Sequence, residues 1–76
     1  MTAQQRIFKQ ALARRAFTLA GYEVVSSKLD TVGVVVVTIN GDTENRAGIQ
    51  HVIYDLSIGA TDEAKTHVVA RCVFQD

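Results

Sequence analysis

Apolar side chains recur at helical spacing over the first twenty residues. The spacing is that of a helix, which turns about 100° per residue. Thr2 and Gln5 stand at the spacing of a capping box at the start of this stretch. Gly21 follows it and can take the left-handed conformation that ends helices. The pattern predicts a helix over residues 2–20. One broad arc of this helix is apolar and is expected to lie on a sheet; it consists of Ile7, Phe8, Ala11, Leu12, Ala16 and Leu19.

Two residues interrupt this pattern. Arg15 falls inside the apolar arc, where its aliphatic stem is expected to lie along apolar surface with the guanidinium at the rim. Phe17 falls on the opposite side, and an exposed aromatic side chain beside arginines is typical of an interface anchor. The alternative is that Phe17 packs against Tyr22. The helix residues expected to bind a partner are Arg6, Lys9, Arg14 and Phe17.

After Gly21 the apolar period falls to two, and Val, Ile and Thr become frequent. We expect strands at residues 22–28, 34–39, 49–58 and 66–74, a long exposed loop at 40–48 and a second loop at 59–65. The predicted fold is α+β: one N-terminal helix packed on a four-stranded antiparallel β-sheet, an α-β-β-β-β meander, in a single domain of residues 1–76. The alternative is a split βαβ arrangement, whose crossover helix only residues 59–65 could supply.

A single helix covers only one face of such a sheet, so the apolar residues of the other face should be exposed. Burial of roughly 300 Å² of such a patch would favour association by about 7 kcal/mol before the costs of binding. The sequence therefore predicts a homodimer or a protein complex, unless the third strand twists so that loops cover both faces. The expected dimer face consists of Val35, Val37, Ile39, Ile49, Ile53, Val69 and Val73.

The charges are balanced overall but separated along the chain. The 76 residues carry eight basic and eight acidic side chains. Four basic residues and no acid occur in residues 1–20, so the predicted helix is cationic and the remainder anionic. The acids expected to bind a partner lie in the two predicted loops and are Asp42, Glu44, Asp62 and Glu63. The alternative is that they only make the loop tips soluble.

Composition limits the class of protein. An apolar content of 47% is too high for a disordered segment, and no apolar run reaches the roughly 18 residues needed to cross a bilayer. The chain lacks a signal peptide pattern, so a cytoplasmic location is expected. Cys72 is expected in the core, and His51 and His67 are expected too far apart to bind one ion. No catalytic motif, metal site or cofactor site is predicted.

The small size, the outline of one helix and a sheet, and the lack of catalytic motifs together resemble the small phage-encoded inhibitors of bacterial defence systems known as anti-CRISPR proteins. The resemblance implies a non-catalytic protein that inhibits a CRISPR effector complex by direct binding, in the cytoplasm of the host cell. Two alternatives remain open. One is a nucleic-acid-binding module that uses the basic helix, and the other is a small homodimeric ligand-binding or accessory subunit with its pocket at the dimer seam.

Overall fold

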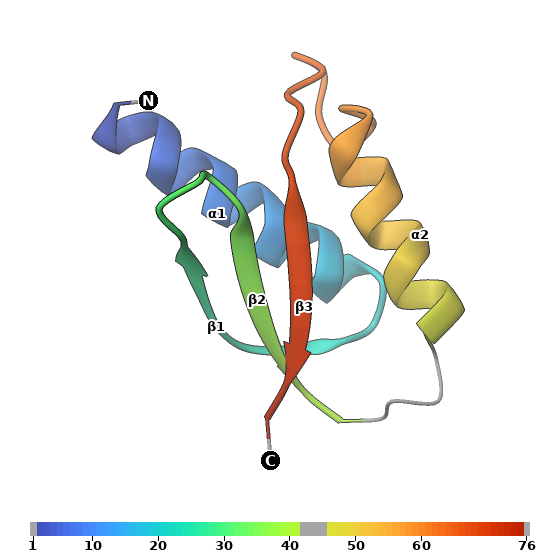
Figure 1. The fold of residues 1–76 in the computed structure, drawn as a ribbon. Helices are drawn as coiled ribbons and strands as arrows, with labels where there is room; N and C mark the ends of the chain where they lie inside the picture. The colour runs from blue at the N-terminus through green and yellow to red at the C-terminus, as the bar shows by residue number, and fades with distance from the viewer. Residues whose placement is uncertain (1, 42–45, 76) are drawn as a thin grey trace.

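Two helices pack on a three-stranded mixed sheet (Figure 1). The computed structural model of the protein describes residues 2–41 and 46–75. The sheet order is β1-β2-β3: β1 pairs with β2 antiparallel, and β3 pairs with β2 in parallel. Helix α2 connects the two parallel strands. The elements are α1 (Ala3–Leu19), β1 (Glu23–Leu29), β2 (Val35–Asn40), α2 (Arg46–Ser57) and β3 (Ala70–Phe74).

The α+β class is confirmed, but the four-stranded antiparallel meander is wrong. Residues 49–58, predicted as the third strand, form most of α2, and β3 covers only the second half of the predicted fourth strand. Parallel neighbours such as β2 and β3 cannot be joined by a tight hairpin, so the chain crosses over through a helix. The alternative with a crossover helix at residues 59–65 also placed that helix too late in the chain.

The predicted ends of α1 are confirmed. The Thr2 hydroxyl accepts a hydrogen bond from the Gln5 amide at 3.1 Å, and the Thr2 amide donates to the Gln5 side-chain oxygen at 2.9 Å. These two bonds form the expected capping box. At the other end Gly21 has a φ of 97°, which only glycine adopts at little cost.

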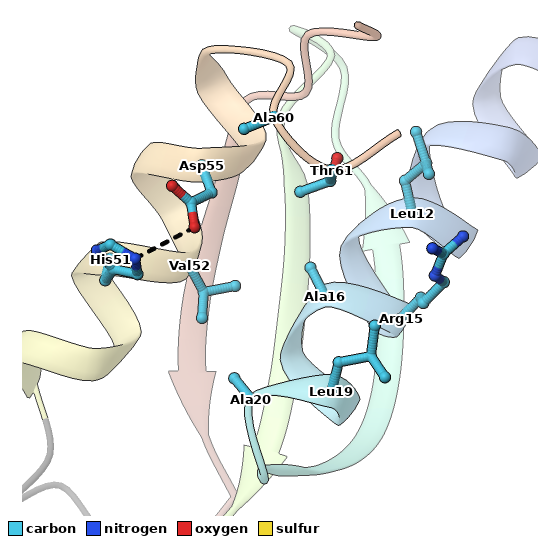
Figure 2. Close-up of a pocket in the computed structure, with 10 residues that line it drawn as sticks. All are labelled: Leu12, Arg15, Ala16, Leu19, Ala20, His51, Val52, Asp55, Ala60 and Thr61. Carbon is cyan, nitrogen blue, oxygen red and sulfur yellow. Dashed lines mark ion pairs between the residues drawn. The ribbon is translucent and has the colours of Figure 1, made fainter. Parts of the chain in front are cut away.

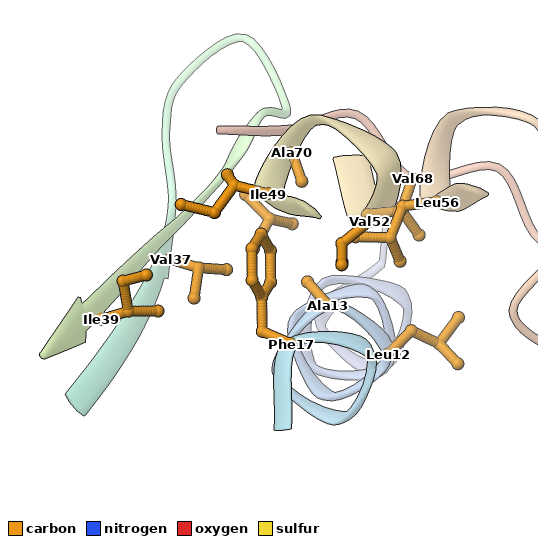
Figure 3. Packing of buried hydrophobic residues seen from close by; sticks show 11 residues of the cluster. Leu12, Ala13, Phe17, Val37, Ile39, Ile49, Val52, Leu56, Val68 and Ala70 are labelled. Carbon is orange, nitrogen blue, oxygen red and sulfur yellow. The ribbon is translucent and has the colours of Figure 1, made fainter. Parts of the chain in front are cut away.

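The predicted core face of α1 is correct for Leu12, which is buried, and for Ala16, which packs against the core, but wrong for Ile7, Phe8, Ala11 and Leu19, which are exposed. The residues of α1 that are buried are Leu12, Ala13 and Phe17, and Phe17 has no exposed surface. The Phe17 ring lies at the centre of the core (Figure 3) and packs edge to face on Tyr22, with ring centroids 6.0 Å apart. Phe17 is therefore a core residue and is not available to a partner. The expected docking role for Phe17 is corrected, and its packing on Tyr22 is the alternative that the structure shows.

The expected dimer face is not a surface of this fold. Val35, Val37 and Ile39 of β2 are fully buried under the two helices, and Ile49 is buried on α2. Ile53, also on α2, is partly buried against the same core. The register places only Val69 and Val73 of the expected set on the opposite face of the sheet. The prediction failed because α1 itself packs on the face of β2 that it was expected to leave open, and α2 packs beside it against α1 and β3.

Candidate functional site

Three of the exposed large apolar side chains in the described part of the chain lie on one side of α1. We call it the α1 flank, and it consists of Ile7, Phe8, Ala11, Arg15 and Leu19. The exposed fractions of its three large apolar side chains are 67% for Ile7, 47% for Phe8 and 76% for Leu19. At a rise of about 1.5 Å per residue, the stripe from Ile7 to Leu19 is about 18 Å long. Exposed apolar surface of this extent on one helix is typical of a docking surface.

A groove runs beside this flank, between α1 and α2 (Figure 2). Its volume is about 350 Å³, and its walls include Leu12, Ala16 and Leu19 from α1 and Val52 from α2. A second hollow, lined by Phe8 and the 60–65 segment, shares Leu12 and Arg15 with the first. The two hollows therefore adjoin along α1, and we call them together the α1–α2 groove. Such a groove can receive an apolar side chain or a short apolar segment.

Polar groups stand at the edges of this groove. His51 and Asp55 lie one turn apart on α2, and the His51 Nε2 atom is 3.3 Å from the Asp55 Oδ2 atom. Arg15 lies on the opposite wall, as Figure 2 shows. The hydroxyl oxygen of Thr61, at the end of the groove, is buried and has no hydrogen-bond partner among the described residues. The groove thus offers apolar walls with both signs of charge at its borders.

The cations of α1 are mostly exposed. Arg6, Arg14 and Arg15 are exposed and Lys9 is partly buried, while α1 contains no acidic residue. Within residues 2–41 and 46–75, the ion pair found is that of His51 with Asp55, so the α1 cations have no acidic partner there. At about 100° per residue, Arg15 lies within the α1 flank and Arg14 borders it beside Ile7, whereas Arg6 and Lys9 lie on other sides of the helix.

Of the four predicted acidic contact residues, two can be placed. The Asp62 carboxylate accepts hydrogen bonds from the Thr66 amide at 2.8 Å and the Thr66 hydroxyl at 3.0 Å. Asp62 is thus already engaged in holding its own loop. Glu63 is exposed and lines the end of the groove near Phe8. Asp42 and Glu44 lie outside the described residues.

The remaining reactive side chains are dispersed. The His67 Nδ1 atom lies 2.8 Å from the Ser57 carbonyl oxygen. Cys72 is partly buried, and this burial raises the pKa of its thiol, which disfavours the nucleophilic thiolate. In the part of the chain that the structure describes, no three His, Cys, Asp or Glu side chains come together to hold a metal ion. Neither described helix is long and apolar enough to traverse a bilayer.

The α1 flank was missed from the sequence because its residues were assigned to the core. Arg15 was the available signal: a charged residue in the middle of an apolar arc indicates that the arc is at least partly open to water. Of the helix cations expected to bind a partner, Arg6 and Arg14 are exposed, and their binding role stays a prediction.

Comparisons of the chain with protein-family models, with curated proteins and with solved structures return no match. The resemblance to anti-CRISPR proteins therefore stays a prediction. The function is therefore inferred from the α1 flank and the α1–α2 groove.

Proposed function

We propose that this chain is a non-catalytic protein-binding module that docks through the α1 flank onto a partner protein. The observation that carries this proposal is the exposure of Ile7, Phe8 and Leu19 along one side of a helix that has four cations and no acid. The partner surface that fits is an apolar patch or cleft bordered by carboxylates. Apolar contact then provides affinity, and the opposite charges provide orientation and speed of association.

The apolar part of this contact is large enough to matter. The exposed fractions of the three side chains add up to about two whole side chains. Complete burial of that surface favours binding by about 3–6 kcal/mol before the entropy costs of association. The α1–α2 groove adds a place where one apolar side chain of the partner can insert beside Leu19. Contact along an 18 Å stripe is about the length that a helix of some twelve residues presents.

A nucleic acid fits this surface less well. Phosphates would be bound by Arg6, Arg14 and Arg15, but the large apolar side chains between them have no role in phosphate binding. The pI of 6.7 is also low for a dedicated nucleic-acid-binding domain. Nucleic-acid binding is therefore kept as an outcome of the test below.

The test compares three variants with the unaltered protein. Ile7→Gln and Leu19→Gln each remove an exposed apolar side chain and keep good helix formers, so neither should change the stability. Val32→Thr is the control, because Val32 is 81% exposed in the β1–β2 turn and is not part of the α1 flank. Tagged proteins are used to isolate partners from a bacterial lysate, and purified CRISPR effector complexes are included as the partner class that the resemblance implies.

Binding of any captured partner is then measured by titration. Each flank variant should weaken it about tenfold, which corresponds to about 1–2 kcal/mol of lost apolar burial, and Val32→Thr should have no effect. Equal binding by all variants would overturn the docking role of the flank. A complex that instead contains nucleic acid, weakens steeply with salt and depends on Arg6 and Arg14 would replace the proposal with the nucleic-acid reading.

A further inference from the structure

Strand β3 has a free outer edge. The Val35 amide donates to the Val69 carbonyl, and the Gln75 amide donates to the Ile39 carbonyl, both at 2.9 Å. Successive residues of a strand point their backbone groups to opposite edges, so the odd-numbered residues of this segment face β2. Ala70, Cys72 and Phe74 consequently turn their N–H and C=O groups outward. Because β3 is the last strand in the sheet order, no described strand pairs with these groups.

The two edges of the sheet differ. The pairing of β1 is interrupted by a bulge between Val24 and Ser26, and the exposed Lys28 lies on the same strand. Bulges and lysines are devices that prevent an edge strand from pairing with another chain. The pairing of β3 with β2 runs without interruption over five residue pairs, and β3 contains neither a lysine nor a bulge. Only β3 is regular enough to accept a further strand.

A hollow of about 520 Å³ lies against this edge, between β3 and α2. Ile49 and Ile53 of α2 and Cys72 and Phe74 of β3 provide apolar walls. In Figure 1, α2 lies on the outer side of β3, away from β2. A strand added beside β3 would therefore lie under α2 with one face against these isoleucines.

The described charged residues that line the hollow are both basic. Arg46, at the start of α2, and Arg71, on β3, both line it, and no acidic residue of the described ranges 2–41 and 46–75 does. Guanidinium groups bind carboxylates through paired hydrogen bonds. An extended segment that fits here thus alternates apolar residues, directed at α2, with polar residues that include at least one Asp or Glu.

We infer that the outer edge of β3 captures an extended, acidic segment of a partner protein as a fourth strand. The segment forms main-chain hydrogen bonds with Ala70, Cys72 and Phe74, places apolar side chains against Ile49 and Ile53, and pairs a carboxylate with Arg46 or Arg71. This is strand addition to an open sheet edge. The site is separate from the α1 flank, so either can fail without the other.

A second copy of this chain does not fit the same edge. Two-fold pairing of β3 with itself would place both α2 helices on one side of the joined sheet. Neighbouring strands are about 4.8 Å apart, whereas packed helices need about 8–10 Å. Since α2 lies outward of β3, the two helices would collide. A single extended segment has no such obstacle.

The probe is a phage-displayed library of random peptides of about nine residues, near the upper end of ordinary strand lengths, selected against the full chain. Enriched peptides are synthesised and titrated into isotopically labelled protein while amide exchange is followed by NMR. The expected peptides alternate apolar and polar residues and carry an Asp or Glu. Their binding should slow the exchange of the Ala70, Cys72 and Phe74 amides, whereas those of Arg71 and Val73 are already bonded to β2 and should change little.

Variants and modified peptides complete the test. Arg46→Gln and Arg71→Gln should each weaken binding about tenfold, and Arg14→Gln on α1 is the matched control that should not. Methylation of those alternate backbone nitrogens of the peptide that face β3 should abolish binding. A selection that enriches nothing, peptides without an acid, or protection that does not alternate along β3 would each overturn the inference. Protection of the same amides without peptide, together with a concentration-dependent dimer in sedimentation, would show that a second copy occupies the edge instead.

Discussion

Phe17 is buried and Phe8 is half exposed, the reverse of what the sequence pattern predicts, and the stability of variants at these two positions tests this difference. Phe17→Ala removes a side chain with no exposed surface from the centre of the core, together with its edge-to-face contact with Tyr22. Truncation of a buried Phe costs about 3–5 kcal/mol. A chain of 76 residues is expected to have a total stability of about 4–11 kcal/mol. This variant should therefore lose much of its stability, and at the low end of that range it should unfold.

Two matched variants separate the role of the ring from the effect of any mutation in α1. Phe8→Ala truncates the same side chain where about half of it is already in water, so it should cost below about 2 kcal/mol. Phe17→Leu keeps most of the buried apolar volume and should cost about 1–2 kcal/mol, part of it from the lost aromatic pair. Urea unfolding followed by circular dichroism measures all three, with the midpoint as the readout.

The order of the three variants decides the result. Phe17→Ala should be the least stable by at least about 1 kcal/mol, a margin that rests on the difference in buried surface. If Phe8→Ala proves as destabilising as Phe17→Ala, α1 packs through the arc that the sequence pattern predicted. The α1 flank would then be part of the core, and the proposed docking surface would be lost with it.

Three further outcomes follow from local geometry. Thr2→Ala removes the N-cap hydroxyl of α1 and should cost about 1 kcal/mol, or about 4–8 °C in Tm, while Thr2→Ser should restore most of the loss; no change in Tm would show that the cap is not formed in solution. Gly59→Ala should lower the stability more than Gly21→Ala. Both glycines have positive φ, but a Cβ at Gly59 would lie 2.5 Å from the Lys65 carbonyl oxygen, whereas a Cβ at Gly21 meets nothing within 4 Å. Equal melting temperatures of the two variants would contradict this. Burial raises the pKa of Cys72, so its thiol should react with iodoacetamide more slowly in the native protein than in the urea-unfolded chain. The contribution of this thiol to stability should be present at neutral pH and be lost as the pH rises through the raised pKa. Equal rates of alkylation would argue against burial of this thiol.

The parts of the fold that were predictable have local signals. The start of α1 is encoded by the side chains of Thr2 and Gln5, and its end by the backbone freedom of Gly21. Strands β1 and β2 follow from short Val-rich runs on either side of a turn. In each case the deciding contacts lie within a few residues along the chain, so tertiary packing had little opportunity to override them.

Helix α2 was mispredicted because its sequence satisfies both periods. Tyr54, Leu56 and Ile58 alternate with the polar Asp55 and Ser57 as in a strand. Ile49, Val52 and Leu56 also recur at helical spacing, and these three are the buried residues of α2. Isoleucine and valine favour strands locally. The segment forms a helix because it connects two parallel strands and packs its apolar side against α1 and β3. These tertiary contacts override the local preference for a strand, and they cannot be read from the neighbouring residues in the sequence.

The surplus of apolar surface predicted from the sequence is real, but its position was wrong. The sheet face without helices does not expose its central valine: Val36 is only 3% exposed, and the register places Lys28 on one side of it and Arg71 on the other. Long aliphatic stems beside a valine shield it while their charges stay in water. With one sheet face covered by two helices and the other shielded in this way, apolar side chains remain open to a partner on α1, and main-chain groups remain open along β3. On the sheet face without helices Val69 is 60% exposed, but it lies before the start of β3, so we expect a partner to meet the side of α1 or the edge of β3 before the flat face of the sheet.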